Sequence, residues 1–375
     1  MKIYLVGGAV RDHLLGLPVK ERDYVVVGAT TDEMLDQGFR QVGKEFPVFL
    51  HPKSSEEYAL ARMERKVKPG YQGFNFDASA NVTLEEDLKR RDLTINAMAE
   101  TPEGELIDPY HGKSDLDNKI LRHVSDAFVE DPVRILRIGR FLARYYHLGF
   151  KVADETIELM RNMVKSGEVN ALVAERVWKE LERALGESNP EKFFAVLNQC
   201  GALSTLFPHL NIDGPGIHAL IAAAELTQDT TVRFAALLHA MPEENIDDNI
   251  YAKIAVANIC NRYRVPNAYR ELALLIALNF KEAFRAQELS VDELLHFFSV
   301  LDIYRREDRF QKFLIACQAI AKINAVIFDS VWLHEAATIT KSVNSKALLT
   351  QGLEGAEFAK ALKEERKKML EKWMG

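Results

Sequence analysis

Strand-forming patterns are confined to the first part of this 375-residue chain, and helical periodicity takes over after Pro132. Short apolar or alternating runs predict β-strands, whereas apolar residues that recur every three to four positions predict helices. We therefore predict an α+β fold, in which a head with a mixed sheet and helices precedes an all-α remainder. The strands are expected at residues 3–6, 24–27, 46–50, 58–62, 105–107 and 121–122, and the first helices at 31–36 and after Thr83.

Composition narrows the classes of protein to consider. With 47% hydrophobic and 27% charged residues, the chain is typical of globular proteins and long enough for two or three domains. It has no run of 18 apolar residues, and the apolar start is too short for a signal peptide, so we expect a cytoplasmic protein without membrane contact. Cys200, Cys260 and Cys317 lie far apart and are expected to be buried free thiols. The net charge of −7 means that a nucleic-acid partner would need a local basic surface.

The first chemically informative segment is residues 5–23, where an apolar strand runs into Gly7-Gly8 and a helical turn carries Arg11. A short loop then ends in Glu21-Arg22-Asp23, directly before a strand. Alternation along a strand would place Glu21 and Asp23 on one face. Two carboxylates beside a glycine turn suit Mg²⁺ and a phosphate. This combination predicts phosphoryl or nucleotidyl transfer, although an acidic pair alone is more often a solvated turn.

Residues 83–97 combine a helix start with a cluster of charges. Thr83 and Glu86 are spaced as a capping box. Asp92 and Asn96 are four residues apart, so on a helix they would share a face that could hold a ribose, while Arg91 could reach a triphosphate. The alternative is an ion-pair cluster on the surface. Residues 66–80 contain Gly, Pro and aromatics without periodicity and predict a mobile loop.

A third motif spans residues 130–141, where Pro132 fits the first helical position and makes Asp131 the expected N-cap. Arg134 would lie one turn further and about 60° around the helix. Asp131 could then accept a hydrogen bond from the amino group of cytosine or adenine, and Arg134 could donate to a ring acceptor. Guanine and uracil present the reversed pattern, which costs roughly 1–3 kcal/mol for each buried group left unpaired. Arg137 and Arg140 continue around the helix and better suit phosphates.

Two other features remain open between a structural and a functional role. Residues 108–116 are rich in turn formers, so we expect a structural or hinge role there and no metal ligand at Asp115. Glu57 precedes a predicted strand and is either a third carboxylate facing the metal or a surface glutamate.

Five ordered motifs give the chain a strong resemblance to the class II tRNA nucleotidyltransferases, the bacterial CCA-adding enzymes of the multifunctional type. The motifs are GGAVRD…ERD, RRDLTINA, DPYHGKSDL, EDPVRILRIGRF and AERVWKELERAL. The resemblance implies a polymerase-β-like nucleotidyltransferase head at 1–125, a helical neck at 126–207 and an all-α body and tail at 208–375. It also implies addition of CMP, CMP and AMP to the 3′ end of tRNA, from CTP and ATP with Mg²⁺.

Residue roles follow from the same resemblance. Glu21 and Asp23 would be catalytic and hold Mg²⁺, and Asp131 with Arg134 would form the protein template for the base. The other residues expected at the incoming nucleotide are Gly8, Arg11, Arg91, Asp92, Asn96, Arg137 and Arg140.

The chain departs from the family pattern at several places. Glu21 replaces the usual aspartate, and the extra methylene could move a metal by about 1 Å, which can cost ~100-fold in rate. Multifunctional relatives carry an HD phosphohydrolase domain, but here Ala240 follows His239, and Phe280-Lys281 stand where a second His-Asp pair is expected. We therefore predict no HD-type hydrolase activity.

Residues 210–375 match the family weakly, so tRNA contacts cannot be assigned there one by one. Arg305-Arg306 and Lys367-Lys368 are candidates, although such clusters are more often solvated helix faces. The sequence leaves A-adding, CC-adding and poly(A)-polymerase activities open as alternatives, although poly(A) polymerases typically carry basic extensions that this acidic chain lacks. It also leaves open a non-catalytic tRNA-binding module, and a monomer or a homodimer.

Overall fold

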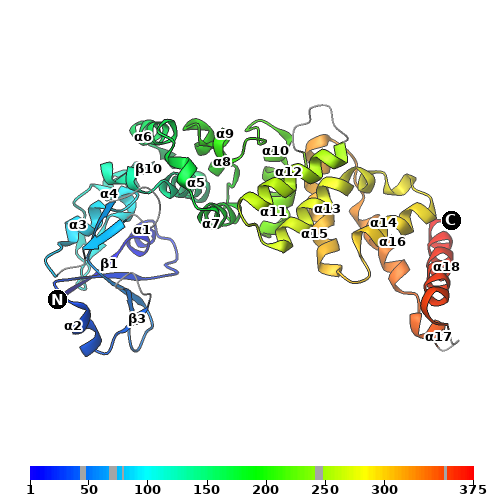
Figure 1. Cartoon of the computed structure of the whole chain (residues 1–375), viewed down its shortest axis with the longest axis horizontal. Coiled ribbons are helices and arrows are strands. Elements are labelled where there is room, and N and C mark those ends of the chain that lie inside the picture. Colours follow the sequence, from blue (N-terminus) through cyan, green and yellow to red (C-terminus); the bar gives the residue numbers. More distant parts are fainter. Residues whose placement is uncertain (43–47, 67–73, 78–79, 241–247, 350–352) are drawn as a thin grey trace. The chain divides into compact units, whose positions relative to one another are not determined.

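The computed structural model describes residues 1–42, 48–66, 74–77, 80–240, 248–349 and 353–375. The chain divides into two compact units, Met1–Pro208 and His209–Gly375. Figure 1 shows strands in the first unit and a run of helices in the second, which is the predicted α+β fold class. Within the described part of the chain, no helix is long and apolar enough to span a membrane.

The head of the first unit is built on a mixed sheet with the strand order β3-β4-β5-β2-β1-β8-β9 among the described residues. The two central strands, β1 (Lys2–Val6) and β2 (Asp23–Val27), pair antiparallel, and β2 pairs in parallel with β5 (Glu57–Leu60). The outer strands are β3 (Arg40–Val42), β4 (Val48–Leu50), β8 (Ala99–Glu100) and β9 (Leu106–Ile107). The sequence pattern located β1 and β2 within one residue but missed β3 and β8.

Alternation along β2 divides the core of the head between the two faces of the sheet. Val25 packs into one apolar cluster with Val6 and Leu88, whereas Val26 packs into another with Met34 and Phe49. The helices of the head are α1 (Gly8–Leu14), α2 (Thr31–Asp36), α3 (Leu84–Lys89) and α4 (Gly112–Asp117), with a 3₁₀ turn η2 (Thr94–Asn96).

The predicted capping box is confirmed at the start of α3. The Thr83 hydroxyl accepts a hydrogen bond from the Glu86 N–H at 3.3 Å, and the Glu86 carboxylate accepts one from the Thr83 N–H at 2.9 Å. The two bonds satisfy donors that would otherwise be unpaired at the first turn of the helix.

The prediction of a loop over residues 66–80 is wrong in part. Strand β6 (Met63–Lys66) pairs antiparallel with β7 (Phe74–Asp77). Polar and aromatic residues alternate over 74–77, a period-two pattern that favours a strand once a partner strand is available. Residues 67–73 and 78–79 of the predicted loop lie outside the described residues.

Helices dominate the rest of the first unit. They are η3 (Asp126–Glu130), α5 (Val133–Tyr145), η4 (Tyr146–Leu148), α6 (Asp154–Lys165), η5 (Glu168–Ala171), α7 (Ala174–Leu185), α8 (Glu191–Gln199) and α9 (Ala202–Leu206). The all-α prediction has one exception, since β10 (Ile120–Leu121) pairs in parallel with β11 (Lys151–Val152). Helix α5 packs on α7 and α8, and Gly139 permits close approach because a Cβ there would lie 3.0 Å from the Phe193 ring.

The described part of the second unit is all helical. Its elements are α10 (Pro215–Leu226), α11 (Thr230–Leu237), α12 (Asp248–Arg262), α13 (Asn267–Phe284), η6 (Ala286–Glu288), α14 (Val291–Leu301), α15 (Glu307–Asn324), α16 (Ser330–Lys341), α17 (Ser345–Leu349) and α18 (Gly355–Met374). Helices α10, α11, α13 and α15 pack together, and α18 packs on α14 and α16. As predicted, the three cysteines are free and buried.

Candidate nucleotidyl-transfer site

The acidic pair lies at the end of the central sheet where β2 begins. Asp23 is the first residue of β2, and Glu21 precedes the strand, so strand alternation does not extend to Glu21. The two carboxylates are nevertheless close enough to interact. The Asp23 side chain is accessible to solvent, yet the surrounding protein partly desolvates its carboxyl group. This desolvation is the largest effect, and it raises the pKa of Asp23 above its ordinary value. The Arg91 guanidinium lowers the pKa in part, and the Glu21 carboxylate raises it.

Glu57 lies opposite Asp23 in the parallel register of β2 and β5, and its side chain is exposed. Within the described residues, however, no three His, Cys, Asp or Glu side chains converge as a metal site. Mg²⁺ is usually bound by one or two carboxylates together with water and substrate phosphates. The mutual repulsion of Glu21 and Asp23 is relieved by such a cation, so the pair fits Mg²⁺ that is completed by a triphosphate.

Arg91 lies against Gly7 and near the carboxylate of Asp23. Gly7 has a φ of +70°, and a Cβ on it would lie 2.7 Å from Nη1 of Arg91. Glycine is therefore required both by the left-handed backbone and by the closeness of the guanidinium. Arg91 also donates to Asp87 at 3.3 Å, while its buried Nε has no hydrogen-bond partner. The residues predicted to meet the triphosphate and the metal, Arg91 and Asp23, thus lie close together beside the Gly7-Gly8 turn.

Asp92 and Asn96 are joined by their side chains, although not through the expected helix. Asp92 lies in a bend and Asn96 in the 3₁₀ turn η2, so the prediction of a shared α-helical face is wrong. The Asn96 amide donates to Asp92 at 3.0 Å, and Nε of Arg137 donates to the other carboxylate oxygen at 2.6 Å. Burial raises the pKa of Asp92, but Arg137 and Asn96 outweigh it and hold the pKa well below its usual range.

Arg11 is buried within the protein. Its Nε and Nη2 each lie 2.9 Å from the Asp12 carboxylate, and its Nη1 donates to Asn96. The guanidinium also lies near the Phe141 and Tyr145 rings, and the Tyr145 hydroxyl donates to Asp12 at 3.0 Å. These contacts join α1 to α5, and contact of Arg11 with a phosphate stays a prediction.

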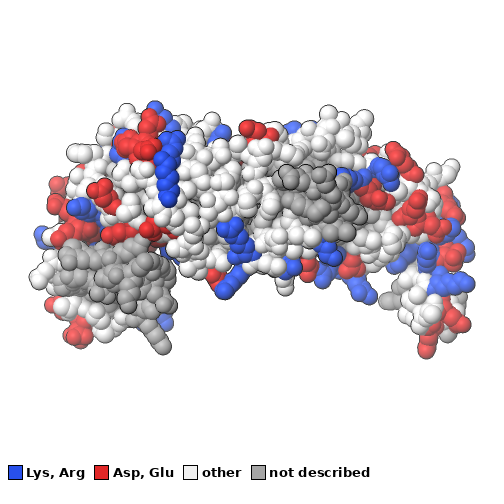
Figure 2. Space-filling model, turned by 45° about the horizontal axis from the view of Figure 1, so that its top comes forward, with Lys and Arg blue, Asp and Glu red and all other residues white. Residues whose placement is uncertain are grey.

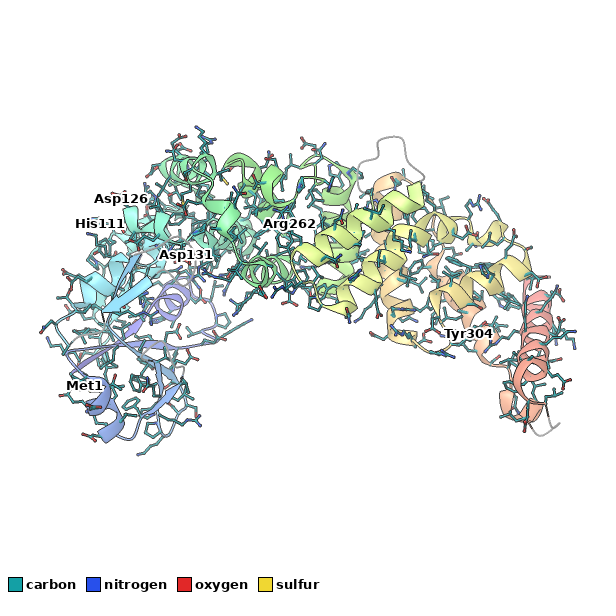
Figure 3. The ribbon with its side chains drawn as sticks, viewed as in Figure 1. Met1, His111, Asp126, Asp131, Arg262 and Tyr304 are labelled. Carbon is teal, nitrogen blue, oxygen red and sulfur yellow. The ribbon has the colours of Figure 1, made fainter. Side chains whose placement is uncertain are left out.

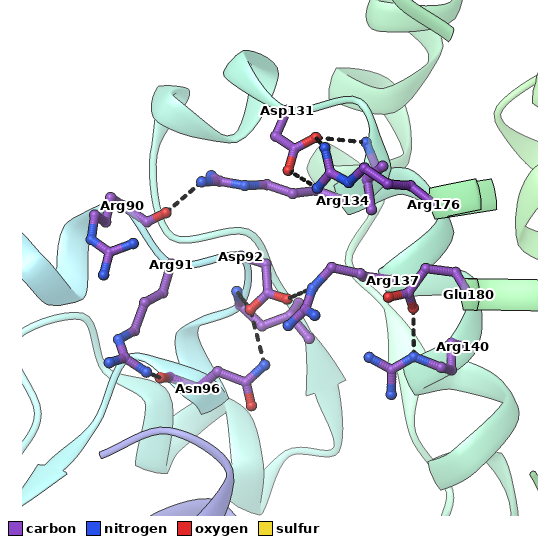
Figure 4. A network of polar contacts seen from close by, with 12 residues as sticks. Arg90, Arg91, Asp92, Asn96, Asp131, Arg134, Arg137, Arg140, Arg176 and Glu180 are labelled. Carbon is purple, nitrogen blue, oxygen red and sulfur yellow. Dashed lines mark hydrogen bonds and ion pairs between the residues drawn. The ribbon is translucent and has the colours of Figure 1, made fainter. Parts of the chain in front are cut away.

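Asp131 and Arg134 flank the start of α5, and Asp131 is labelled in Figures 3 and 4. The helix begins at Val133 with Pro132 in the cap position, so Asp131 is not the N-cap, but its carboxylate still accepts from the Val133 N–H at 3.1 Å. Arg134 donates to two backbone carbonyls, that of Ala127 at 3.0 Å and that of Arg90 at 2.6 Å.

Sequence reasoning missed the partners of this motif. Arg176 of α7 donates to both oxygens of Asp131, and Glu180 of α7 accepts from Arg140 at 2.6 Å (Figure 4). Arg176 and Glu180 are four residues apart in AERVWKELERAL, so they share a helix face. This four-residue spacing is the sequence signal that could have identified Arg176 and Glu180 as partners on one helix face.

Residues 108–116 support the site from outside, as expected of a structural role. Asp108 accepts from the backbone N–H groups of Gly112 and Lys113 at 2.7 and 2.9 Å, and Asp115 accepts from the Thr94 hydroxyl at 2.7 Å. A Cβ on Gly112 would lie 2.2 Å from the Thr94 carbonyl oxygen, so α4 packs directly on η2. The turn that carries Asn96 is therefore held by α4.

Comparisons with known proteins show which proteins this chain resembles. Residues 3–122 match the Poly A polymerase head domain, and residues 149–213 match the probable RNA and SrmB-binding site of polymerase A. The chain is 51% identical to a multifunctional CCA protein of Thioalkalivibrio sulfidiphilus, covering 96% of each chain. It is also 51% identical to a CCA-adding enzyme of Coxiella burnetii, covering 96% of this chain and 93% of that one. The chain belongs to the CCA-adding enzyme family.

Solved structures of CCA-adding enzymes share the fold. An apo form matches with a TM-score of 0.71 at 22% identity, covering 98% of this chain and 88% of that one. A Thermotoga maritima CCA-adding enzyme complexed with tRNA matches with a TM-score of 0.68 at 21% identity, covering 98% and 87%.

The segment where multifunctional relatives are expected to carry an HD site is a packed core here. His239 is buried, its Nδ1 lies 2.8 Å from the Ala236 carbonyl oxygen, and its ring meets the Phe280 ring edge-on. Burial lowers the pKa of His239 to about 4, so the ring is neutral at pH 7. Residues 241–247 lie outside the described residues.

The two basic clusters proposed as tRNA contacts are partly neutralised. Arg306 pairs with Glu271, Lys367 with Asp292, and Lys368 with Glu365. On the face shown in Figure 2, Lys and Arg of the C-terminal helices are interspersed with Asp and Glu. Solvated helix faces therefore explain these clusters better than a basic tRNA-binding patch.

Proposed function

We propose that this chain is a CCA tRNA nucleotidyltransferase, which adds CMP, CMP and AMP in sequence to the 3′ end of tRNA from CTP and ATP and releases pyrophosphate. The observation that carries the proposal is the grouping of Asp23, Glu21 and Arg91 beside the Gly7-Gly8 turn at the end of the central sheet. Residues 1–125 form its catalytic head, 126–207 its neck, and 208–375 its body and tail. Buried free thiols and the absence of a membrane-spanning helix among the described residues fit a cytoplasmic enzyme.

Glu21 and Asp23 would hold Mg²⁺, which would supply Lewis-acid activation of the attacking 3′ hydroxyl and charge neutralisation of the triphosphate. Arg91 donates to the triphosphate, because its guanidinium already interacts with Asp23 and lies against the glycine turn. Gly8 has no side chain, so the phosphates can approach its backbone. Arg11 supports the glycine turn from within the core. Asp92 fixes Asn96 and Arg137 beside the nucleotide and remains ionised.

Asp131 and Arg134, at the start of α5, select the base. Asp131 accepts from the exocyclic amino group of cytosine or adenine, and Arg134 donates to the ring acceptor beside it. The carbonyl groups of Ala127 and Arg90 fix the plane of the Arg134 guanidinium. Uracil and guanine present an acceptor to the carboxylate and a donor to the guanidinium, so each mismatch leaves buried groups unpaired at roughly 1–3 kcal/mol apiece.

The test is an extension assay with tRNAs that end at the discriminator base, at C and at CC. Each tRNA is incubated with CTP and ATP, together and singly, in the presence of Mg²⁺. Stepwise completion to CCA supports the proposal. Addition of C alone, of A alone or of a long A tail would instead assign a CC-adding enzyme, an A-adding enzyme or a poly(A) polymerase, and no addition would leave a tRNA-binding module.

We further propose that the second unit has no phosphohydrolase activity, because a buried neutral His239 followed by Ala240 offers no His-Asp pair. The assay is metal-dependent hydrolysis of a 2′,3′-cyclic phosphate. Robust turnover that is lost when His239 is changed would contradict this proposal.

A further inference from the structure

Two ion pairs bind helix α7 to α5 and to the segment just before α5. Helix α7 supplies the cation of one pair and the anion of the other. Arg176 donates to Asp131 through both terminal nitrogens, at 3.1 Å to Oδ1 and 2.7 Å to Oδ2. One turn later, Glu180 accepts from Arg140 at 2.6 Å. Figure 4 shows both pairs reaching across from α7. A forked contact of this kind fixes the plane of the carboxylate, which a single hydrogen bond does not.

The hydrogen bonds of Asp131 define what its carboxylate can still accept. An ionised carboxylate has about four lone-pair positions, two on each oxygen. Oδ1 accepts from Val133 N–H and from Arg176, so both of its positions are used. Oδ2 accepts from Arg176 alone in the part of the chain that the structure describes, so one position remains. Arg176 therefore leaves Asp131 with one acceptor position in a fixed plane.

We propose that Arg176 is a positioning residue that determines base specificity: it orients the Asp131 carboxylate so that the remaining lone pair of Oδ2 meets the amino group of the incoming cytosine or adenine. This inference rests on the proposed function and assigns a role to a residue outside the template motif. Arg176 does not itself contact the base.

The other half of the template is held in a comparable way. Arg134 donates to the carbonyls of Ala127, in η3, and Arg90, which follows α3. Asp131 and Arg134 are thus each held by contacts from outside α5, in addition to the hydrogen bond that the Val133 N–H of α5 donates to Asp131. Without Arg176, the Asp131 carboxylate keeps, among the described residues, only its bond from Val133 N–H and can rotate about its terminal torsion, so its acceptor direction is no longer fixed.

The experiment compares Arg176→Ala and Arg176→Lys with the unchanged chain. For each, kcat and KM are measured for CTP, ATP and UTP on tRNA substrates, together with the melting temperature. Arg176→Ala is expected to reduce the ratio of kcat/KM for CTP over UTP by roughly tenfold or more, the range of one charge-assisted hydrogen bond. Arg176→Lys keeps the charge without the fork and is expected to lose less. Arg183→Ala, an exposed arginine on the same helix, is the matched control and should leave the ratio unchanged.

A double-mutant cycle separates positioning from a general loss of structure. If Arg176 acts through Asp131, the CTP-over-UTP ratio should be no lower in Asp131→Ala/Arg176→Ala than in Asp131→Ala alone. An unchanged ratio in Arg176→Ala, or a loss that adds to that of Asp131→Ala, would overturn the inference. If Arg176→Ala does not fold, Arg176→Lys carries the test, and a ratio equal to that of the unchanged chain refutes it. Failure of the unchanged chain to extend tRNA would refute the proposed function instead.

Discussion

Asp12 provides the sharpest test of how the head is joined to α5. It is buried and accepts from Arg11, from the Tyr145 hydroxyl at 3.0 Å and from Arg144 at 3.2 Å. Asp12→Ala removes the only carboxylate paired with Arg11 within the described residues, and Arg11 is just 4% exposed. Removing one partner of a buried ion pair typically costs 3–5 kcal/mol. Since 1 kcal/mol shifts the melting temperature by about 2–4 °C at this domain size, we expect a fall of roughly 10 °C.

The assay is thermal unfolding at pH 7, followed by calorimetry. Asp117→Ala is the control, because Asp117 forms an exposed pair with Lys113 and should change stability by less than about 1 kcal/mol. Replacing Arg11 by Met in the Asp12→Ala background removes the unpaired buried charge and should recover part of the loss. A melting temperature for Asp12→Ala within 2 °C of the unchanged chain, or no recovery with Arg11→Met, would refute the reasoning.

The remaining predictions concern the metal ligands, the support of η2 and the buried histidine. Asp23→Ala should abolish nucleotide addition, whereas Glu21→Asp should retain or raise kcat, since it only shortens the ligand; a Glu21→Asp enzyme as inactive as Asp23→Ala would contradict this. Gly112→Ala should destabilise the chain by about 3 kcal/mol or more in chemical denaturation, because its Cβ would lie 2.2 Å from the Thr94 oxygen; a loss under about 1 kcal/mol would contradict this. His239 has a folded-state pKa lowered from 6.5 to about 4, so its stabilising effect is complete above pH 6.5 and is lost as the pH falls toward 4. Between pH 7 and 5 the unchanged chain should lose about 2 kcal/mol that His239→Leu does not lose, as measured by unfolding at both pH values; equal losses would contradict this assignment.

Local patterns in the sequence were sufficient for the central strands and for the capping box of α3. The apolar runs of β1 and β2 and the Thr83–Glu86 spacing act over a few residues, so the sequence shows them directly. The two-residue strands β8 and β11 carry no period of their own and form only because a partner strand lies beside them. Likewise, β7 depends on pairing with β6.

The same distinction holds for the candidate site. Asp23, Glu21 and Arg91 were predicted from their motifs and lie close together. What the sequence could not show is how the remaining predicted residues are held. Asp131 is bound by Arg176 from 45 residues away, and Arg11 is bound by Asn96 from 85 residues away. Such partners are fixed by the tertiary fold, and no local pattern specifies them.

The central claim is that the protein itself selects C and A without a nucleic-acid template. Sequencing of tRNA 3′ ends after incubation with equal concentrations of all four nucleoside triphosphates tests this most directly. The unchanged chain should produce ends that stop at CCA, and Asp131→Ala should produce ends that also contain U or G. Mixed ends from the unchanged chain, or ends from Asp131→Ala that are as uniform as those of the unchanged chain, would contradict the account.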